Sequence, residues 1–274
     1  MVVSNELIQK EADEMPFVAN EVLPGVHHIK DAMGVCMTLL VGDNAALLVD
    51  TGYGTEDVQA YVKTITSLPQ TVLLTHGHHD HALGARWFEK TCMFAEDIPD
   101  FVTYTGAETR ERVLGQAKAK GLTTDAGFMT DDIPLPEVLQ EGDIDLGGMT
   151  ARVIHCPGHT PGSAVVYVPE RSLLLTADDW NPCTWLFFPA ALGVKEYRSN
   201  VQKLSQLPHT HVLCSHQPVL FERSMMDDFL ANLTDDTLRA AVPVDITPYE
   251  ATDTRQAQLP HGQILVFDWA KALL

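Results

Sequence analysis

Short apolar runs separated by turn residues dominate the first third of the chain and predict strands. The runs lie at residues 25–30, 35–41, 45–50 and 71–75. The turn Gly-Asp-Asn at 42–44 predicts that the second and third runs form a hairpin. Between the last two runs, residues 55–67 have the pattern of a helix.

The same kinds of element return in the second half of the chain. We expect strands at 151–156, 163–168, 172–177, 211–215 and 263–267, and helices at 195–207 and 224–241. The stretches "TLLVGDNAALLVDTG" and "VVYVPERSLLLTADD" are similar: each is a strand, a tight turn and a strand that ends in aspartate. Two such halves, each a sheet with helices outside, suggest a sandwich of helix, sheet, sheet and helix, although two apolar hairpins can also be similar by chance.

The predicted organisation is a single domain over residues 1–274 with two additions. Residues 96–136 are charged, partly helical and free of strand signals, which indicates a lid-like insertion over one face. A C-terminal helix and tail occupy about 224–274.

Composition and charge narrow the function classes. Apolar residues make up 45% of the chain, as in ordinary globular proteins, and the longest apolar runs are too short to span a membrane. The formal charge of −19 would repel a nucleic-acid backbone, so we expect a small-molecule partner. The N-terminus has no pattern of a signal peptide, and the five cysteines are widely spaced; both favour a cytoplasmic location.

The stretch "HGHHDH" at 76–81 follows the predicted buried strand at 71–75. His76 and His78 are two residues apart, so in extended backbone they project the same way and could supply half of a zinc site. Asp80 and His81 follow at a tight turn and can point to a second place nearby, whereas the same alternation points His79 away. A polar surface loop would have this composition too, but a bound dication removes the cost of crowding so many titratable groups.

Three further polar residues also stand where predicted strands end. His159 lies in "CPGHTPGS", Asp178 ends the second hairpin, and His216 follows the strand at 211–215. This recurrence favours a metal site built from several segments. We expect Asp179, the neighbour of Asp178, to be solvated or to cap a helix.

These motifs, in this order and spacing, resemble those of the metallo-β-lactamase superfamily from about residue 25 to 220. The resemblance implies an α/β (α+β) fold, the four-layer αββα sandwich, with two metals between the sheets. The ligands that it implies are His76, His78 and His159 for the first metal, Asp80, His81 and His216 for the second, and Asp178 as the bridge. It also implies that Asp50 in "LLVDTG" supports the metal loops; family members often have glycine before the bridging aspartate, where this chain has Ala177.

This ligand set implies a hydrolase, because two metals roughly 3.5–4 Å apart lower the pKa of a shared water towards ~7. Asp80 would orient that water and carry its proton, which makes it the expected catalytic side chain. We expect two zinc ions, with iron or manganese as alternatives, and a small ester, thioester or lactone as substrate.

The segment 180–193 has no helical or strand period and could form an apolar wall beside the metals. Its candidate substrate contacts are Trp180, Trp185 and Phe187, and the basic candidates in the next helix are Lys195 and Arg198. Core packing or a contact between two copies of the chain, a homodimer, also accounts for the aromatic residues and is slightly favoured, and simple exposure would account for the basic ones.

Two other functions fit the same residues. An iron-dependent persulfide dioxygenase of the same fold would use similar ligands, because histidine and carboxylate also suit iron. A binding protein that kept the fold and lost its metals is the third class, although unpaired histidine and aspartate are costly in a dry cleft.

Overall fold

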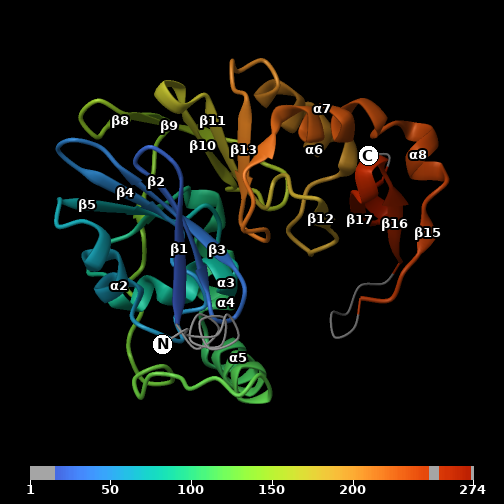
Figure 1. Cartoon of the computed structure of the whole chain (residues 1–274). Helices are drawn as coiled ribbons and strands as arrows, with labels where there is room; N and C mark the ends of the chain where they lie inside the picture. Colours follow the sequence, from blue (N-terminus) through green and yellow to red (C-terminus); the bar gives the residue numbers. More distant parts are fainter. Residues whose placement is uncertain (1–15, 247–252, 273–274) are drawn as a thin grey trace, which may run out of the picture.

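Two large β-sheets stack against each other in the computed structural model, which describes residues 16–246 and 253–272 (Figure 1). The first sheet has seven strands in sequence order. They are β1 (Phe17–Leu23), β2 (Val26–Asp31), β3 (Cys36–Val41), β4 (Ala46–Val49), β5 (Gln70–Leu73), β6 (Cys92–Met93) and β7 (Glu137–Val138). Strands β1 to β4 pair antiparallel, and β4 to β7 pair parallel.

The second sheet has six strands in the order β14-β13-β11-β10-β9-β8. Their bounds are β8 (Gly142–Asp145), β9 (Thr150–His155), β10 (Ala164–Val168), β11 (Leu173–Ala177), β13 (His211–Cys214) and β14 (Phe221–Glu222). All neighbours pair antiparallel except β11 and β13, which are parallel.

The similarity of the two hairpins reflects a repeated topology. In the first half, β3 and β4 form an antiparallel hairpin, α2 (Val58–Ile65) follows, and β5 returns parallel to β4. In the second half, β10 and β11 form the hairpin, α6 (Val194–Leu204) lies on the returning path, and β13 is parallel to β11. The loops that follow β4, β5, β11 and β13 can therefore converge on one site.

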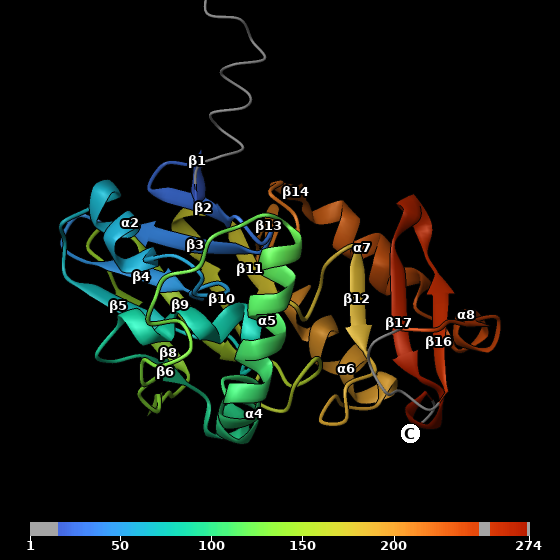
Figure 2. The same cartoon turned by 90° about the horizontal axis from the view of Figure 1, so that it is seen from below.

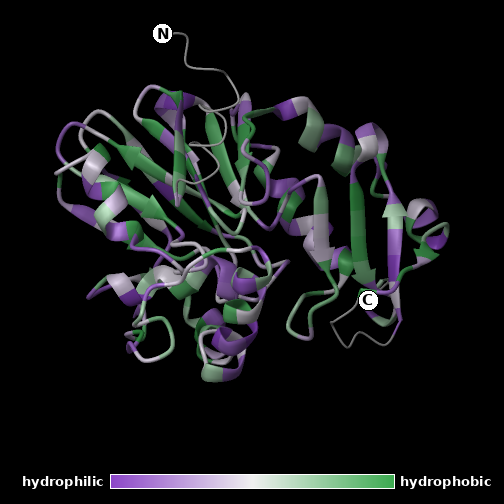
Figure 3. Cartoon of the chain, turned by 60° about the horizontal axis from the view of Figure 1, so that its bottom comes forward, coloured by the Kyte–Doolittle hydropathy of each residue, from purple (hydrophilic) through white to green (hydrophobic). Residues whose placement is uncertain are grey.

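The hydrophobic core confirms the αββα arrangement. Apolar side chains of β4 and β5 pack against those of β10 and β11 between the sheets. The outer face of the first sheet is covered by Val58 and Val62 of α2, and that of the second by α6 and α7 (Arg223–Asn232). The strands are mostly hydrophobic, whereas the covering helices alternate between hydrophobic and hydrophilic residues (Figure 3). This is the pattern that the burial of sheets on both faces requires.

A third, four-stranded sheet is not predicted by the sequence pattern. It has the order β12-β17-β16-β15, with bounds β12 (Cys183–Leu186), β15 (Val242–Pro243), β16 (Thr254–Gln258) and β17 (Ile264–Asp268). The expectation that 180–193 lacks a strand is wrong, because β12 pairs in parallel with the distant β17. Such a pairing is a tertiary effect that local alternation does not reveal.

The helix expected at 224–241 is two helices. The first, α7, ends at Asn232, and α8 (Asp235–Arg239) begins after a break. The Thr234 side chain accepts a hydrogen bond from the Thr237 backbone N–H, which starts a new helix at the sequence Thr-Asp-Asp. The remaining short helices are α3 (His79–Ala82), η1 (Leu83–Trp87), η2 (Ala95–Asp97), η3 (Pro169–Arg171), η4 (Pro260–Gly262) and η5 (Trp269–Lys271).

The insertion at 96–136 consists of α4 (Ile98–Tyr104), α5 (Ala107–Ala119) and turns, without a strand. Figure 2 shows α4 and α5 on the lower face, between the first sheet and β12. Arg110 fixes the segment internally, since its guanidinium donates to the carbonyls of Thr105, Phe128 and Asp131. In the part of the chain that the structure describes, no helix has the length and apolarity to cross a bilayer.

The turn between β3 and β4 joins the two sheets, because Asp43 and Asn44 donate backbone hydrogen bonds to Gly147 and Leu146. A Cβ atom on Gly42 would collide with the carbonyl of Leu146. We predict that Gly42→Ala lowers the free energy of unfolding by about 2–4 kcal/mol in urea titrations. The control Gly115→Ala places its Cβ in open space within α5 and is expected to stabilise by up to ~1 kcal/mol. Equal stability of the two variants would contradict the prediction.

Candidate metal centre

The histidine-rich loop begins where β5 ends. Residues 75–77 form a bend, and His78 has extended backbone before α3 starts at His79. The rings of His76 and His78 meet after this bend, with His76 Nε2 3.1 Å from His78 Nδ1. Both side chains are buried.

His159 completes a group of three imidazoles. Its Nε2 lies 3.0 Å from His78 Nδ1, and its Nδ1 lies 2.7 Å from the carbonyl oxygen of Trp185. A proton on Nδ1 that is donated to this carbonyl leaves the lone pair on Nε2, facing the other two rings. Ligand atoms around a tetrahedral zinc are about 3.3 Å apart, since zinc–nitrogen bonds are about 2.0–2.1 Å. The spacing of His76, His78 and His159 therefore suits a metal ion.

A second group of three lies beside the first. His81 Nε2 and His216 Nε2 are each 3.7 Å from Asp80 Oδ2. Asp80 and His81 come from α3, and His216 comes from the loop that follows β13. These atoms are also close enough together to hold a metal ion.

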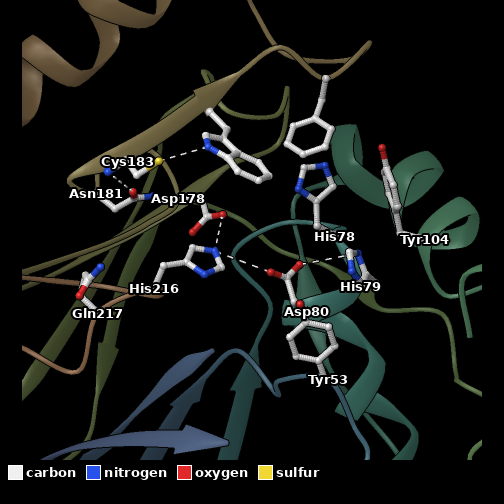
Figure 4. A pocket seen from close by; sticks show the side chains of 12 residues that line it. Tyr53, His78, His79, Asp80, Tyr104, Asp178, Asn181, Cys183, His216 and Gln217 are labelled. Carbon is white, nitrogen blue, oxygen red and sulfur yellow. Dashed lines mark hydrogen bonds and ion pairs between the residues drawn. The ribbon is translucent and has the colours of Figure 1, made fainter. Parts of the chain in front are cut away.

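Asp178 lies between the two groups (Figure 4). Its Oδ2 is 3.6 Å from His159 Nε2, 3.6 Å from His81 Nε2 and 3.0 Å from His216 Nε2. The structure thus brings together all seven residues that the sequence singles out. They form three overlapping groups of three, and within each group the ligand atoms lie within 4.8 Å of one another. A carboxylate in this position can contact two cations.

The residue before Asp178 has unusual backbone. Ala177 has φ of 46°, a left-handed conformation that costs roughly 1–2 kcal/mol for a residue with a Cβ atom. Glycine would adopt it freely, which explains physically why a glycine suits this place. The strained turn at the end of β11 directs Asp178 towards the histidines.

Asp50, at the end of β4, supports the histidine loop. Its φ of 67° is also left-handed. The carboxylate accepts hydrogen bonds from the Thr75 backbone N–H at 2.7 Å and from the Thr75 hydroxyl, and its Oδ2 lies 2.9 Å from His81 Nδ1. A proton on Nδ1 donated to Asp50 leaves Nε2 of His81 as the ligand atom.

The protonation of the groups suits cation binding. Burial lowers the pKa of His76, His78 and His159, so these imidazoles are neutral and their lone pairs are available. Burial would raise the pKa of both carboxyls, but neighbouring histidines outweigh it; they lower the pKa of Asp80 to about 2 and hold that of Asp178 well below its usual range.

Several buried atoms in the site have no hydrogen-bond partner among the described residues. They include His81 Nε2, His78 Nε2 and Asp178 Oδ1. Burial would lower the pKa of His81, but three carboxylates, first that of Asp80, raise it well above its usual value. The negative field around His81 Nε2 therefore attracts positive charge, which a metal ion supplies as well as a proton. Imidazole and carboxylate donors fit zinc, iron and manganese.

Two buried aspartates to which the sequence assigns no role in the site position the ligand loops. Asp97 accepts hydrogen bonds from the Gly77 and Gly162 backbone N–H groups and from the Thr160 hydroxyl, and thereby connects the two loops that carry His76 and His159. No motif marks Asp97, because it stands in the polar insertion like any exposed acid.

Asp179 is buried rather than solvated, so that expectation is wrong. Its Oδ1 accepts a hydrogen bond from the His159 backbone N–H, and its backbone carbonyl accepts one from the Tyr197 hydroxyl. Asp179 therefore holds the loop of one candidate ligand while its neighbour Asp178 faces the site.

A pocket of about 350 Å³ opens beside these groups. It is lined by Tyr53, His78, His79, Asp80, Tyr104, Asp178, Asn181, Cys183, Trp185, Phe188, His216 and Gln217. His79 belongs to the lining although alternation pointed it away, because the helix α3 begins at this residue. It lies outside the groups that could hold a metal.

Only one of the five expected substrate contacts, Trp185, lines this pocket. Trp180 is fully buried in the core beside α6, and Phe187 packs in a cluster with Val266, so the neighbouring Phe188 takes its place in the lining. Lys195 is exposed on α6, and Arg198 donates to the carbonyl of Leu233. The order of side chains in β12 and its loop is set by the pairing with β17, which the sequence pattern does not show.

Comparison with known proteins agrees with this architecture. The family model described as "Metallo-beta-lactamase superfamily" matches residues 32–216. The probable metallo-hydrolase YqgX of Bacillus subtilis is 26% identical over 196 residues, which cover 65% of this chain and 83% of that protein. Hydroxyacylglutathione hydrolase of Cereibacter sphaeroides is 31% identical, covering 64% of this chain and 62% of its own length.

Acyl-coenzyme A thioesterase MBLAC2 of Gallus gallus is 25% identical, covering 62% of this chain and 66% of its own length. The chain thus spans slightly under two thirds of these last two proteins. Among solved structures, a metallo-beta-lactamase family protein from Thermus thermophilus has a TM-score of 0.55 at 21% identity, covering 80% of this chain and 82% of that one. This similarity shows a shared fold.

The position of Asp178 between the two groups predicts its effect on metal content. We expect the purified chain to retain about two equivalents of a divalent metal after dialysis, and Asp178→Ala to retain about one or none. Mass spectrometry of the metals measures this directly. His27→Ala, a histidine of β2 outside the groups, is the matched control and should keep the full content. Unchanged content in Asp178→Ala would contradict the assignment.

The buried carboxyl of Asp97 should make the stability of the protein depend on pH. Burial raises the pKa of its carboxyl to about 6, although its three hydrogen bonds oppose the shift. The native state then binds the proton more tightly than the unfolded state, so the stability that Asp97 contributes falls as pH rises through the range from the unfolded value to about 6.

Relative to Asp97→Asn, which cannot titrate, the wild-type chain should lose about 2 kcal/mol of unfolding free energy between pH ~4 and ~7. Urea titrations at several pH values measure the difference. A difference between the two proteins that is independent of pH would contradict the prediction.

Proposed function

Because the chain belongs to the metallo-beta-lactamase superfamily, we propose that it is a metal-dependent hydrolase of a small ester, thioester or lactone. The observation that supports this most is the set of three overlapping donor groups around Asp178, at the base of a pocket of about 350 Å³. Relatives with the names thioesterase and hydroxyacylglutathione hydrolase favour the same kind of chemistry. The charge of −19 favours a small molecule over nucleic acid.

We propose two cations for the site, zinc first, with iron or manganese as alternatives. His76, His78 and His159 would hold one, and Asp80, His81 and His216 the other, with Asp178 in contact with both. Bound there, the cations would supply Lewis acidity and a nucleophilic water at neutral pH.

The side chains around the site perform the remaining steps. Asp80 faces His81 and His216 through Oδ2 and His79 through Oδ1, 3.8 Å from the Nδ1 atom of that ring. Its low pKa keeps it ionised at neutral pH, so it can accept a hydrogen bond from the attacking water and then its proton. Asp80 and His79 both line the pocket, so Asp80 can pass that proton to the leaving group of a substrate bound there.

The aromatic lining restricts water around the reacting carbonyl. Tyr104 and Phe188 lie against the His78 ring, with ring centroids 4.7 Å and 4.5 Å away. Substrate that fills the space between them displaces water, which strengthens each electrostatic contact at the site.

We predict that Asp80→Ala lowers kcat/KM for the best of a panel of esters, thioesters and lactones by about 10²–10⁴-fold, since the carboxylate both orients the nucleophile and carries its proton. Circular dichroism should show an unchanged fold. Asp132→Ala, an exposed acid of the insertion, is the control and should retain full activity.

Protein loaded in turn with zinc, iron and manganese that hydrolyses no member of the panel would contradict the proposed function. Bound iron with oxidation products and no hydrolysis would point to the dioxygenase class instead.

A further inference from the structure

The pocket has two chemically different sides. On the side of His78 lie aromatic rings: Tyr104 and Phe188 against His78 itself, and Tyr53 against His79 with ring centroids 5.4 Å apart. On the other side of Asp178, next to His216, lie Asn181, Cys183 and Gln217 (Figure 4).

The second side is polar but uncharged. Asn181 and Gln217 carry amides, and burial raises the pKa of the Cys183 thiol, so the thiol is neutral at physiological pH. The amides can donate to or accept from a neutral polar group, such as an amide or hydroxyl of the leaving group.

None of the twelve lining residues, all within the described ranges, is lysine or arginine. Among these residues the carboxylates are Asp80 and Asp178, both in the donor groups. Arg112 on α5 acts electrostatically on His79 but does not line the pocket. The proposed cations would be the main positive charges in this pocket, and their donor residues and the attacking water would occupy them. An anionic substituent bound against the aromatic side would therefore lose its hydration without gaining a cationic side chain.

Trp185 connects the aromatic side to the donor groups. Its carbonyl oxygen faces His159 Nδ1 at 2.7 Å, and its indole lines the pocket with its N–H 3.3 Å from Cys183 Sγ. The indole is thus oriented before substrate arrives, so less conformational entropy is lost on binding. Phe188 lies against the rings of both His78 and His159.

We infer that the substrate carries an uncharged apolar acyl group, best a flat aromatic ring, that binds against Trp185 and Phe188, and that acyl groups ending in a carboxylate are rejected. This inference rests on the proposed hydrolase function and specifies its substrate class. The pocket volume of about 350 Å³ is near the lower end of ligand pockets, which suits a single ring and a short linker.

The thioesters 3-phenylpropionyl- and succinyl-N-acetylcysteamine share one neutral leaving group. A difference in their rates of hydrolysis therefore reports on the acyl group alone. We expect the metal-loaded protein to favour the phenylpropionyl compound in kcat/KM by at least about tenfold, because only the succinyl group places a carboxylate in the pocket. Trp185→Ala should reduce this ratio by about tenfold. Arg112→Ala and Trp269→Ala, a tryptophan outside the lining, should leave the ratio unchanged.

Binding gives a readout that needs no turnover. In saturation-transfer NMR with the metal-loaded protein, 3-phenylpropionamide should receive signal at its ring protons, and this transfer should be lost in Trp185→Ala but not in Trp269→Ala. Propionamide, which lacks the ring, is the matched ligand control and should give little transfer.

The possible failures are distinguishable. If neither thioester nor any other member of the ester, thioester and lactone panel is hydrolysed, the proposed function is contradicted, and the NMR result still decides whether the pocket takes an aromatic group. Equal or greater activity towards the succinyl compound, or a ratio that Arg112→Ala changes and Trp185→Ala does not, would overturn the substrate inference alone.

Discussion

The structure depends on holding several mutually repelling polar side chains close together in a buried site. Three buried aspartates outside the donor groups fix the loops that carry these side chains. Asp50 fixes the start of the histidine loop and the His81 ring, and Asp97 connects that loop to the loop of His159. Asp179 holds the His159 backbone. Each carboxylate accepts N–H groups that a loop buried among helices would otherwise leave unpaired. These contacts hold the histidines close together, so the site is preorganised for metal binding.

The repeated topology explains why the site forms where it does. A hairpin, a helix and a returning parallel strand occur in each half, so the ends of β4, β5, β11 and β13 are brought to one edge of the sandwich. Strained backbone at Asp50 and Ala177 then turns the chain sharply at two of these ends. The packed sheets stabilise the strained backbone at these two positions, and the strained turns direct the side chains towards the site.

Much of the framework follows from the sequence, because strands buried on both faces are short apolar runs and the donor residues directly follow them. The seven donor residues are identifiable for this reason, whereas the supporting role of Asp50 is predicted from the resemblance to the superfamily. The aromatic lining is not, because Trp180 and Trp185 are indistinguishable by pattern. Trp180 packs in the core with side chains of α6 and α7, whereas Trp185 belongs to β12, whose pairing with β17 places it beside the pocket. Asp97 is hidden in the same way, since its burial depends on loops more than 60 residues away. Local patterns predict elements, whereas the contacts between distant segments decide which side chains of an element reach a site.

The central claim is that these seven side chains surround a pair of cations, and anomalous X-ray diffraction from crystals grown with the native metal tests it most directly. The account predicts two anomalous peaks roughly 3.5–4 Å apart, each within about 2.0–2.3 Å of its histidine and aspartate donors, with Asp178 between them. A single peak elsewhere in the molecule, or no peak at the histidine cluster in metal-loaded protein, would contradict it.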